Sequence, residues 1–375
     1  MNGAQRIYAE WVSPGHPDRL ADGIAESIVN AALKIDPQAL VGVEVAVHTN
    51  AVFIDGRVAA SRETPALDLE GICREVYRKA GYNKQWGPAP EELRITHDLC
   101  LEPLSDDERL IRQIADDQNV VIGYACNLPS CNFLPPAHWL AHKIGHAIRE
   151  WRESKASAQF GPDFKVLPRL QVKSEPGKPL ELIWDRLTLS IQHATGIGYE
   201  EQHRLLFPVI RDALTQAQAE GLKGVADSFA VSCLHLNGAG DFCQGGPHGD
   251  NGLSGKKLVV DHYGPTVPIG GGALCGKDPH KIDRCGALRA RQLAKSLCRQ
   301  GAHEAWVTLS WAPGESVPSL REIRQTPRLG GVSRLPDPEW FAISAIVRDL
   351  ELCAVDWPSI VRSGYLADPQ TAWER

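Results

Sequence analysis

The chain has 375 residues, of which 43% are hydrophobic and 23% are charged, and its formal net charge is −6. This length supports a sizeable core and predicts two or three domains. The negative net charge argues against a general nucleic-acid binder, and no apolar run is long enough to span a bilayer. The ten cysteines show no Cys-x-x-Cys spacing, and no cationic segment followed by an apolar one is seen at the N-terminus. Both observations favour a reduced cytoplasmic protein.

The N-terminal part is expected to combine strands and helices. Its expected elements are a strand at 7–12, a turn at 13–17, helices at 18–34 and 67–80, and strands at 40–48 and 51–60. The strands at 40–48 and 51–60 are interpreted as a hairpin, with a tight turn at Asp55-Gly56. The stretch 85–116 is rich in proline and charge, and it is interpreted as a long loop with a short helix.

The rest of the chain predicts further units of the same kind. Its expected elements are a strand at 120–125, a helix at 138–151, a turn at 161–165, strands at 169–172 and 186–192, a helix at 199–218, a strand near 228, a helix at 282–298, a strand at 305–311 and a helix at 338–350. Each third mixes strands that look antiparallel with one or two helices. This predicts an α+β fold of three similar domains, at 1–113, 114–227 and 228–375.

Two glycine-rich stretches, 245–257 and 270–283, carry the strongest functional signal. Glycines at this density let backbone N–H groups approach an anion. The charged residues in these stretches include Lys256, Lys257, Lys277, Lys281, Asp250, Asp278 and Asp283. Cations for phosphates and acids for Mg²⁺ or a ribose together predict a polyphosphate site; the alternative is a pair of exposed loops with incidental lysines. Neither stretch has the Walker pattern, and both lie too late in the chain for a Rossmann fingerprint.

The motifs resemble those of the S-adenosylmethionine synthetase (methionine adenosyltransferase) family. Ser13-Pro14-Gly15-His16-Pro17-Asp18 looks like the family's Ser-Glu-Gly-His-Pro-Asp. The resemblance continues through Asp117-Gln118, Pro162-Asp163-x-Lys165 and Ser190-x-Gln192-His193 into the two glycine-rich stretches. There the family has Gly-Gly-Pro-x-Gly-Asp-x-Gly-Leu-Thr-Gly-Arg-Lys and Gly-Gly-Gly-Ala-x-x-Gly-Lys-Asp-x-x-Lys-x-Asp-Arg. Matches in this order cover residues 13 to about 290 and thin out towards the C-terminus.

The resemblance implies an enzyme in which the sulfur of methionine attacks C5′ of ATP and expels the triphosphate, which is then cleaved. It also implies Mg²⁺ and K⁺ as cofactors, ATP and a small-molecule acceptor as ligands, and a homodimer or dimer of dimers with active sites between subunits. Transferred residue by residue, the catalytic roles fall to His16, Lys165 and Lys277, which also contact ATP. The other expected ATP ligands are Asp163, Phe242, Asp250, Lys256 and Lys257. The acceptor is expected at Arg57, Asp117, Asp250 and Lys281, with Mg²⁺ at Asp18 and Asp283 and K⁺ at Glu44. Taken singly, His16 or Asp18 would more often cap a helix than act in catalysis.

The departures from the family pattern fall mainly on the acceptor side of the site. Arg57 stands where the family has a glutamate that binds the methionine ammonium, and Asp241 stands where it has an arginine. Asp116-Asp117-Gln118-Asn119 replaces Gly-Asp-Gln-Gly, an acidic stretch at 105–108 replaces a mobile Gly-Lys-Gln loop, and Lys256 replaces an arginine.

Two interpretations of the charge reversal at Arg57 are open. Either Glu63 replaces the lost carboxylate, or the acceptor is a sulfur or nitrogen nucleophile other than ordinary methionine and the chain is a specialised paralogue. Arg57 by itself favours an acceptor with a second carboxylate or without an α-ammonium group, and Asp241 is a candidate partner for it. A third possibility, of a different class, is a nucleotide-binding paralogue without catalytic activity.

Three histidines, His138, His142 and His146, are spaced so that they share one face of the helix expected at 138–151. This spacing is compatible with a metal-binding stripe. No carboxylate or cysteine partner stands nearby in the sequence, so a packed or solvated face is the favoured interpretation.

Overall fold

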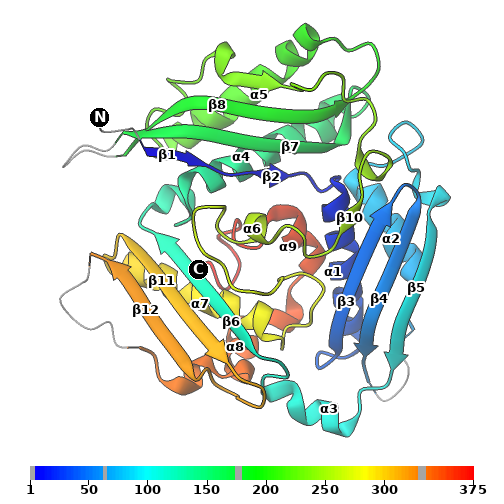
Figure 1. Cartoon of the computed structure of the whole chain (residues 1–375), viewed down its shortest axis with the longest axis vertical. Helices are drawn as coiled ribbons and strands as arrows, with labels where there is room; N and C mark the ends of the chain where they lie inside the picture. The colour runs from blue at the N-terminus through cyan, green and yellow to red at the C-terminus, as the bar shows by residue number, and fades with distance from the viewer. Residues whose placement is uncertain (1–4, 62–65, 174–179, 328–334) are drawn as a thin grey trace.

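The computed structural model describes residues 5–61, 66–173, 180–327 and 335–375. Figure 1 shows three separate β-sheets arranged around a central group of helices. Each sheet is covered by helices on one face, so the predicted α+β fold of three mixed units is confirmed. Within the described ranges, no helix is both long and apolar enough to cross a membrane.

The first sheet has the strand order β10-β3-β4-β5. Its strands are β3 Leu40–His48, β4 Ala51–Ala59, β5 Arg94–Glu102 and β10 Gly252–Leu253, and helices α1 Pro17–Ile35 and α2 Leu69–Ala80 belong to this unit. Alternate residues of β3 are buried, as the sequence pattern predicts. The expected turn at Asp55-Gly56 is wrong, because both residues lie inside β4 and the chain turns at Thr49 and Asn50. A Cβ on Gly56 would lie 2.1 Å from the Gly42 carbonyl oxygen, so this glycine permits close strand contact instead.

Strand β5 was not expected, because 85–116 was interpreted as a loop. Ile95, Leu99 and Leu101 alternate along it and pack against the core, so the signal was present but was hidden by the surrounding charges. Strand β5 runs parallel to β4. Helix α3 Asp106–Leu110 follows it and is capped by Ser105, whose hydroxyl accepts from the Glu108 amide.

The second sheet has the strand order β1-β7-β8-β9, with β2 also paired to β7. Its elements are β1 Gln5–Tyr8, β2 Trp11–Val12, β7 Phe160–Lys173, β8 Glu181–His193 and β9 Leu234–Leu236, with helices α4 Pro136–Trp151 and α5 Tyr199–Ala219. The turn expected at 161–165 is wrong, because these residues lie inside β7. They coincide with an irregularity in the pairing with β8, which explains why glycine and proline occur there.

The third sheet has the strand order β12-β11-β6. Its strands are β6 Asn119–Cys126, β11 Glu304–Trp311 and β12 Leu320–Thr326, and the later helices are α6 Leu258–Asp261, α7 Ile282–Arg299, α8 Ile343–Asp349 and α9 Trp357–Ser363. Strand β12 was not expected from the sequence. The strand expected near 228 is only the short β9, and it pairs with β8 of the second sheet.

The sheets do not follow the three thirds of the chain. Strands β1 and β2 pair with β7, β6 pairs with β11, and β10 pairs with β3, so each sheet contains a strand from another third. The domain boundaries proposed from the sequence stay a prediction. This exchange of strands connects segments distant in sequence, and it brings the glycine-rich stretch at 245–257 to the first sheet.

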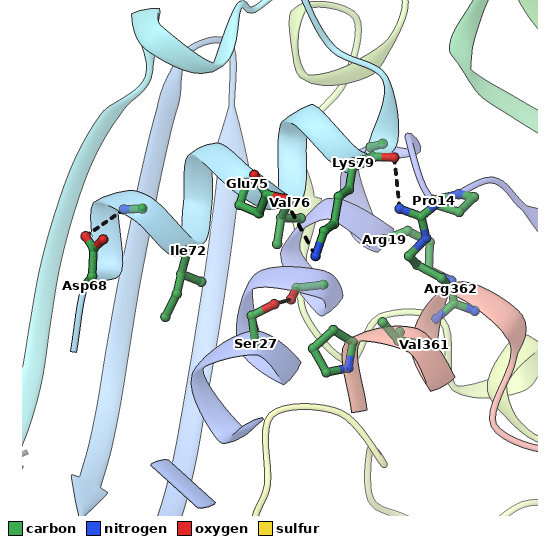
Figure 2. Close-up of a pocket in the computed structure, with 14 residues that line it drawn as sticks. Pro14, Arg19, Ser27, Asp68, Ile72, Glu75, Val76, Lys79, Val361 and Arg362 are labelled. Carbon is green, nitrogen blue, oxygen red and sulfur yellow. Dashed lines mark hydrogen bonds and ion pairs between the residues drawn. The ribbon is translucent and has the colours of Figure 1, made fainter. Parts of the chain in front are cut away.

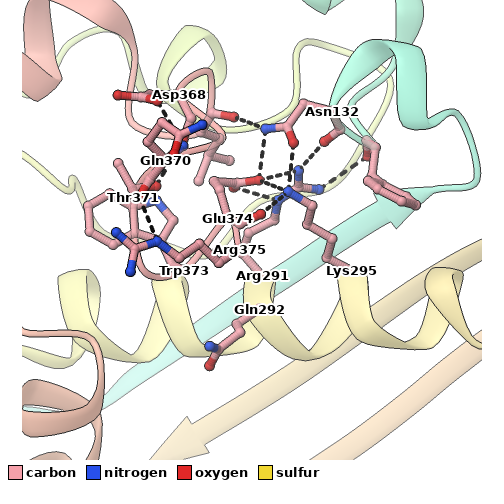
Figure 3. A network of polar contacts seen from close by, with 12 residues as sticks. Asn132, Arg291, Gln292, Lys295, Asp368, Gln370, Thr371, Trp373, Glu374 and Arg375 are labelled. Carbon is pink, nitrogen blue, oxygen red and sulfur yellow. Dashed lines mark hydrogen bonds and ion pairs between the residues drawn. The ribbon is translucent and has the colours of Figure 1, made fainter.

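A buried polar network connects α7 to the C-terminal segment (Figure 3). Glu374 is 1% exposed and accepts from Arg291 at 2.8 Å, from Lys295 at 2.9 Å and from Asn132 at 2.9 Å. The pairing compensates charges that would otherwise be costly to bury.

The histidine stripe on α4 is packed, as the sequence analysis favoured. His138 and His142 are buried with ring centroids 4.7 Å apart, and His146 lies against Trp11. Burial lowers the pKa of His138 to about 3 and that of His146 to about 4, so both rings are neutral at pH 7.

Candidate active site

His16 and Asp18 lie at the start of α1, where the chain enters the first helix after Pro14 and Gly15. His16 is the N-cap, and its Nδ1 accepts from the Asp18 amide at 3.1 Å. Since Nδ1 is an acceptor, the ring proton is on Nε2, which is therefore available as a donor. Burial and the nearby Lys165 ammonium lower the pKa of His16 to about 3, so the ring is neutral at pH 7.

Asp18 binds the first glycine-rich stretch. Lys257 Nζ lies 2.6 Å from Asp18 Oδ2, Lys256 Nζ lies 3.6 Å from Oδ1, and the Leu253 amide donates to Oδ1 at 3.1 Å. Burial would raise the pKa of Asp18, but the hydrogen bonds from Lys257 and Leu253 outweigh it and hold the pKa below its usual range. Asp18 is therefore an ionised carboxylate whose two oxygens both have partners.

Beside this cluster lies a cavity of about 350 Å³ that brings together residues from distant parts of the chain. The predicted site residues that line it are His16, Asp163, Lys165, Phe242 and Asp250, and Asp241 also lines it. Asp163 Oδ2 accepts from the Gly246 amide at 2.8 Å, and burial raises the pKa of Asp163 to about 6. The Phe242 amide donates to His193 at 3.0 Å, which fixes the backbone next to the phenyl ring.

A second cluster surrounds Asp283 at the start of α7. Lys277 Nζ lies 2.7 Å from Asp283 Oδ2, and Asn119 donates to Asp283 Oδ1. A Cβ on Gly272 would lie 1.3 Å from Asp283 Oδ1, so only glycine lets the second glycine-rich stretch pass this carboxylate. Both oxygens of Asp283 therefore have partners, as at Asp18.

Two departures from the family pattern belong to this second cluster. Asn119 binds Asp283, and Asp116 pairs with Lys281. Both substitutions are visible in the sequence, but their partners are not, because the contacts join residues more than 160 positions apart in the chain. Asp117 accepts from the neighbouring Gln118 amide at 2.7 Å, and its expected role at the acceptor stays a prediction.

Arg57 and Glu44 lie on the first sheet, outside these two clusters. Arg57 pairs with Glu102 at 2.5 Å and with Glu108 at 2.7 Å. Asp241, its candidate partner, is instead 3.9 Å from His193 Nε2 and is 84% exposed at its side chain. Glu44 accepts from the Ser254 hydroxyl at 2.5 Å. Glu63, the other candidate for a compensating carboxylate, lies outside the described residues.

The expected cofactors can be tested against these side chains. Asp18 and Asp283 supply the oxygen ligands that Mg²⁺ prefers, and each already attracts a lysine ammonium. Throughout the described ranges, no three His, Cys, Asp or Glu side chains are grouped so that they could hold a metal by themselves. Bound Mg²⁺ in such a site takes most of its ligands from substrate phosphates and water, which two separate aspartates suit. K⁺ at Glu44 stays a prediction.

A separate cavity of about 380 Å³ lies between α1, α2 and α9 (Figure 2). Apolar side chains such as Ile72, Val76 and Val361 line it together with Lys79 and Arg362. Of the described residues around it, none is among those expected to bind ATP, metal or acceptor. The cavity beside His16 is therefore the one that corresponds to the predicted site.

Comparison with known proteins agrees with the motif analysis over nearly the whole chain. The models of the S-adenosylmethionine synthetase N-terminal, central and C-terminal domains match residues 5–99, 112–242 and 244–375. A solved structure described as an unusual S-adenosylmethionine synthetase from Campylobacter jejuni has a TM-score of 0.84 and 24% identity. The match covers 99% of this chain and 96% of the chain in that structure, and it supports the fold.

Curated relatives support the family as well as the fold. The S-adenosylmethionine synthase of Paramagnetospirillum magneticum is 34% identical over 83% of this chain and 78% of its own length. The S-adenosylmethionine synthase of Thermus thermophilus is 30% identical over 100% of this chain and 96% of its own length. These identities indicate a divergent member. The chain therefore belongs to the S-adenosylmethionine synthetase family and is an enzyme of the methionine adenosyltransferase type.

Proposed function

We propose that the chain transfers the adenosyl group of ATP to the sulfur of methionine or a close analogue. A sulfur lone pair forms the bond to C5′ while the C5′–O bond breaks, and its electron pair leaves with the triphosphate. Water then splits the triphosphate into phosphate and diphosphate. The observation that carries the proposal is the cavity beside the paired Asp18 and Lys257, since it offers nucleoside-sized space with Lys165 in its lining and with Lys256 and Lys257 at the adjoining Asp18.

The nucleoside is assigned to the cavity itself. A volume of about 350 Å³ is within the usual range for small-molecule sites. Phe242 offers an aromatic face for the adenine, and Asp163 and Asp250 offer carboxyl groups for the nucleoside hydroxyls or nitrogens. With a pKa near 6, Asp163 changes protonation close to neutral pH, so it can accept or donate a hydrogen bond there.

The triphosphate is assigned to the cationic side of the cavity. Lys165 lines it together with His16, and Lys256 and Lys257 lie next to Asp18. A thioether has no proton to lose, so no general base is needed at the nucleophile. The residues instead stabilise the leaving group, and two charges 4 Å apart interact by roughly 4 kcal/mol at a dielectric constant of 20. The neutral His16 contributes a hydrogen bond from Nε2–H.

The ion pairs explain how Mg²⁺ and ATP would enter together. Lys257 is paired with Asp18, and Lys277 is paired with Asp283. A bound phosphate would pair with the lysine of each pair, and the carboxylate would then be free to hold Mg²⁺. When bound, Mg²⁺ neutralises charge on the triphosphate. The exchange leaves each of these two lysines and two carboxylates with an opposite charge, so we expect metal and nucleotide to bind with positive coupling.

We also propose that the enzyme is a homodimer in which one copy supplies the cavity and the other the Asp283 cluster. The support is the family resemblance, which implies active sites between subunits, together with the separation within one chain of the contacts of His16, Lys165 and Lys257 from those of Lys277 and Asp283. Mixing two inactive variants, Lys257→Met and Lys277→Met, should restore part of the activity if sites combine both copies. No recovery from co-refolded variants would assign all these residues to one chain.

The test of function is a transfer assay with ATP, Mg²⁺, K⁺ and a panel of thioether and amine acceptors. Adenosyl product and stoichiometric phosphate plus diphosphate are expected, and Lys257→Met should reduce both at least about 100-fold. Lys143→Met is the matched control, since Lys143 on α4 pairs with Glu220, directly after α5, away from the cavity. Nucleotide binding without any product would identify a non-catalytic paralogue, and product from a non-methionine acceptor alone would identify a specialised one.

A further inference from the structure

Tyr82 lies directly after α2, and its side chain is buried between segments of the candidate site. Gly81 ends the helix with a left-handed backbone, and the Tyr82 amide donates back to the Tyr77 carbonyl at 3.0 Å. This C-cap fixes the direction in which the chain leaves the helix. Tyr82 is 2% exposed, and its ring lies against the Tyr77 ring with the centroids 5.4 Å apart. The side chain of Tyr82 is therefore held in one place from both its backbone and its ring.

The hydroxyl of Tyr82 binds the turn that carries His16. It donates to the Gly15 carbonyl at 2.5 Å. Burial raises the pKa of Tyr82 well above its usual value, and the charge of Asp163 adds to the rise, so the hydroxyl keeps its proton and acts as a donor. The Gly15 carbonyl belongs to the peptide group that joins Gly15 to His16. The hydrogen bond therefore fixes the backbone from which the His16 side chain starts.

Ser13 holds the same turn from another side. Its hydroxyl donates to the Pro162 carbonyl at 2.7 Å and accepts from the Phe164 amide at 3.0 Å, both on β7. The His16 amide in turn donates to the Ser13 carbonyl at 3.0 Å. The turn is thus attached to the second sheet through Ser13 and to the end of α2 through Tyr82.

Tyr82 also contacts the first glycine-rich stretch. A Cβ on Gly246 would lie 2.0 Å from the Tyr82 hydroxyl oxygen, so the hydroxyl packs directly against this glycine. The Gly246 amide donates to Asp163 at 2.8 Å, and its carbonyl accepts from the Asp250 amide at 3.1 Å. One buried hydroxyl therefore lies between the turn before His16 and the loop that binds Asp163, and both His16 and Asp163 line the cavity.

We propose that Tyr82 is a positioning residue for adenosyl transfer, which sets the place of the His16 imidazole through the hydrogen bond to the Gly15 carbonyl. The inference rests on the proposed function, in which His16 donates from Nε2–H to the departing triphosphate. Tyr82 acts through His16, and it is not part of the cavity lining itself. A displacement of about 1 Å at a reacting group can reduce a rate by about 100-fold, so a bond that fixes one peptide group is sufficient to affect kcat.

Tyr77 offers a matched control for this hydroxyl. Tyr77 is fully buried, and its ring contacts that of Tyr82, but among the described residues its hydroxyl has no hydrogen-bond partner. Tyr77→Phe and Tyr82→Phe remove the same atom from the same pair of rings. An effect seen only in Tyr82→Phe therefore comes from the contacts of its hydroxyl, and not from the loss of a buried oxygen in general.

The experiment measures steady-state adenosyl transfer by the full-length enzyme with ATP, Mg²⁺, K⁺ and the acceptor that the wild type uses best. Tyr82→Phe should lower kcat by about 10- to 100-fold and change the KM for ATP by less than about 3-fold, because the lysines assigned to the triphosphate are untouched. Tyr77→Phe should change neither value. Thermal unfolding of each variant verifies that it is folded at the assay temperature.

A double-mutant cycle with His16 separates positioning from a general loss of structure. In a His16→Ala background, Tyr82→Phe should have little further effect on kcat, because the side chain that it positions is gone. Wild-type kcat in Tyr82→Phe, or a loss by the same factor in both backgrounds, overturns the assignment and leaves the proposed function standing. Absence of adenosyl transfer by the wild type to every acceptor overturns the proposed function, and the assignment with it.

Discussion

The pairing of Lys257 with Asp18 leads to a prediction about nucleotide binding without metal. The ammonium and carboxylate are 2.6 Å apart, and their side chains are 14% and 2% exposed. Without Mg²⁺, a triphosphate must compete with Asp18 for this lysine. Asp18→Asn removes the competing charge and keeps a similar shape, so we expect it to increase the affinity of the protein for metal-free triphosphate.

The size of the effect follows from the contact that is lost. A hydrogen bond to a charged group contributes about 1.5–3 kcal/mol, and about 1.4 kcal/mol corresponds to a factor of ten in an equilibrium constant. We therefore expect metal-free binding to tighten by roughly 10-fold or more in Asp18→Asn. The same variant should lose most of the gain that Mg²⁺ gives the wild type, since Asp18 can no longer act as an anionic ligand.

Calorimetric titration with tripolyphosphate and with a non-hydrolysable ATP analogue, each in EDTA and in Mg²⁺, measures both effects without requiring turnover. Asp185→Asn is the matched control, because Asp185 is also paired, with Arg169 at 2.6 Å, but lies outside the cavity lining. If Asp18→Asn binds metal-free tripolyphosphate no more tightly than the wild type, Lys257 does not exchange its partner and the proposed coupling is wrong.

Three further predictions concern catalysis and stability. Lys277→Ala should lower kcat for adenosyl transfer more than it raises the KM for ATP, if its charge acts mainly on the departing triphosphate; steady-state kinetics with the opposite pattern would assign it to ground-state binding. Glu374→Gln should lower the free energy of unfolding by about 3–5 kcal/mol, because Arg291 would keep a buried charge without its counter-ion; urea unfolding with a loss below about 1 kcal/mol would contradict this. His138 and His146 should make the fold acid-sensitive. Their folded pKa values, about 3 and about 4, lie below the unfolded value near 6.5. The unfolded state therefore takes up protons that the folded state does not, and the free energy of unfolding falls as the pH drops below 6.5. At pH 5.5 each ring should lower the free energy of unfolding by about 1.4 kcal/mol. Between pH 7.5 and 5.5, His146→Leu should therefore lose less free energy of unfolding than the wild type; equal losses would exclude this ring as a cause.

The sequence by itself determined the local elements whose residues carry their own signal. Helix α1 begins where Pro17 and Asp18 follow a capping residue, and β3 alternates apolar and polar residues along its length. Such patterns depend on neighbours within a few residues, so they can be seen without the fold. The glycine-rich stretches are similarly local, and with the other motifs they were sufficient to indicate the family.

The tertiary structure decided which segments pair and which charges meet. The chain turns at Thr49 and Asn50 rather than at Asp55-Gly56, and β5 forms because β4 offers it a parallel edge. Lys257 meets Asp18 across 239 residues, and Arg57 meets Glu102 and Glu108 rather than Asp241. Strand edges and buried ion pairs are selected by the packing of the whole chain, because desolvation and geometry at each contact depend on every element around it. No local pattern carries that information, so residue types were predictable at this site and their partners were not.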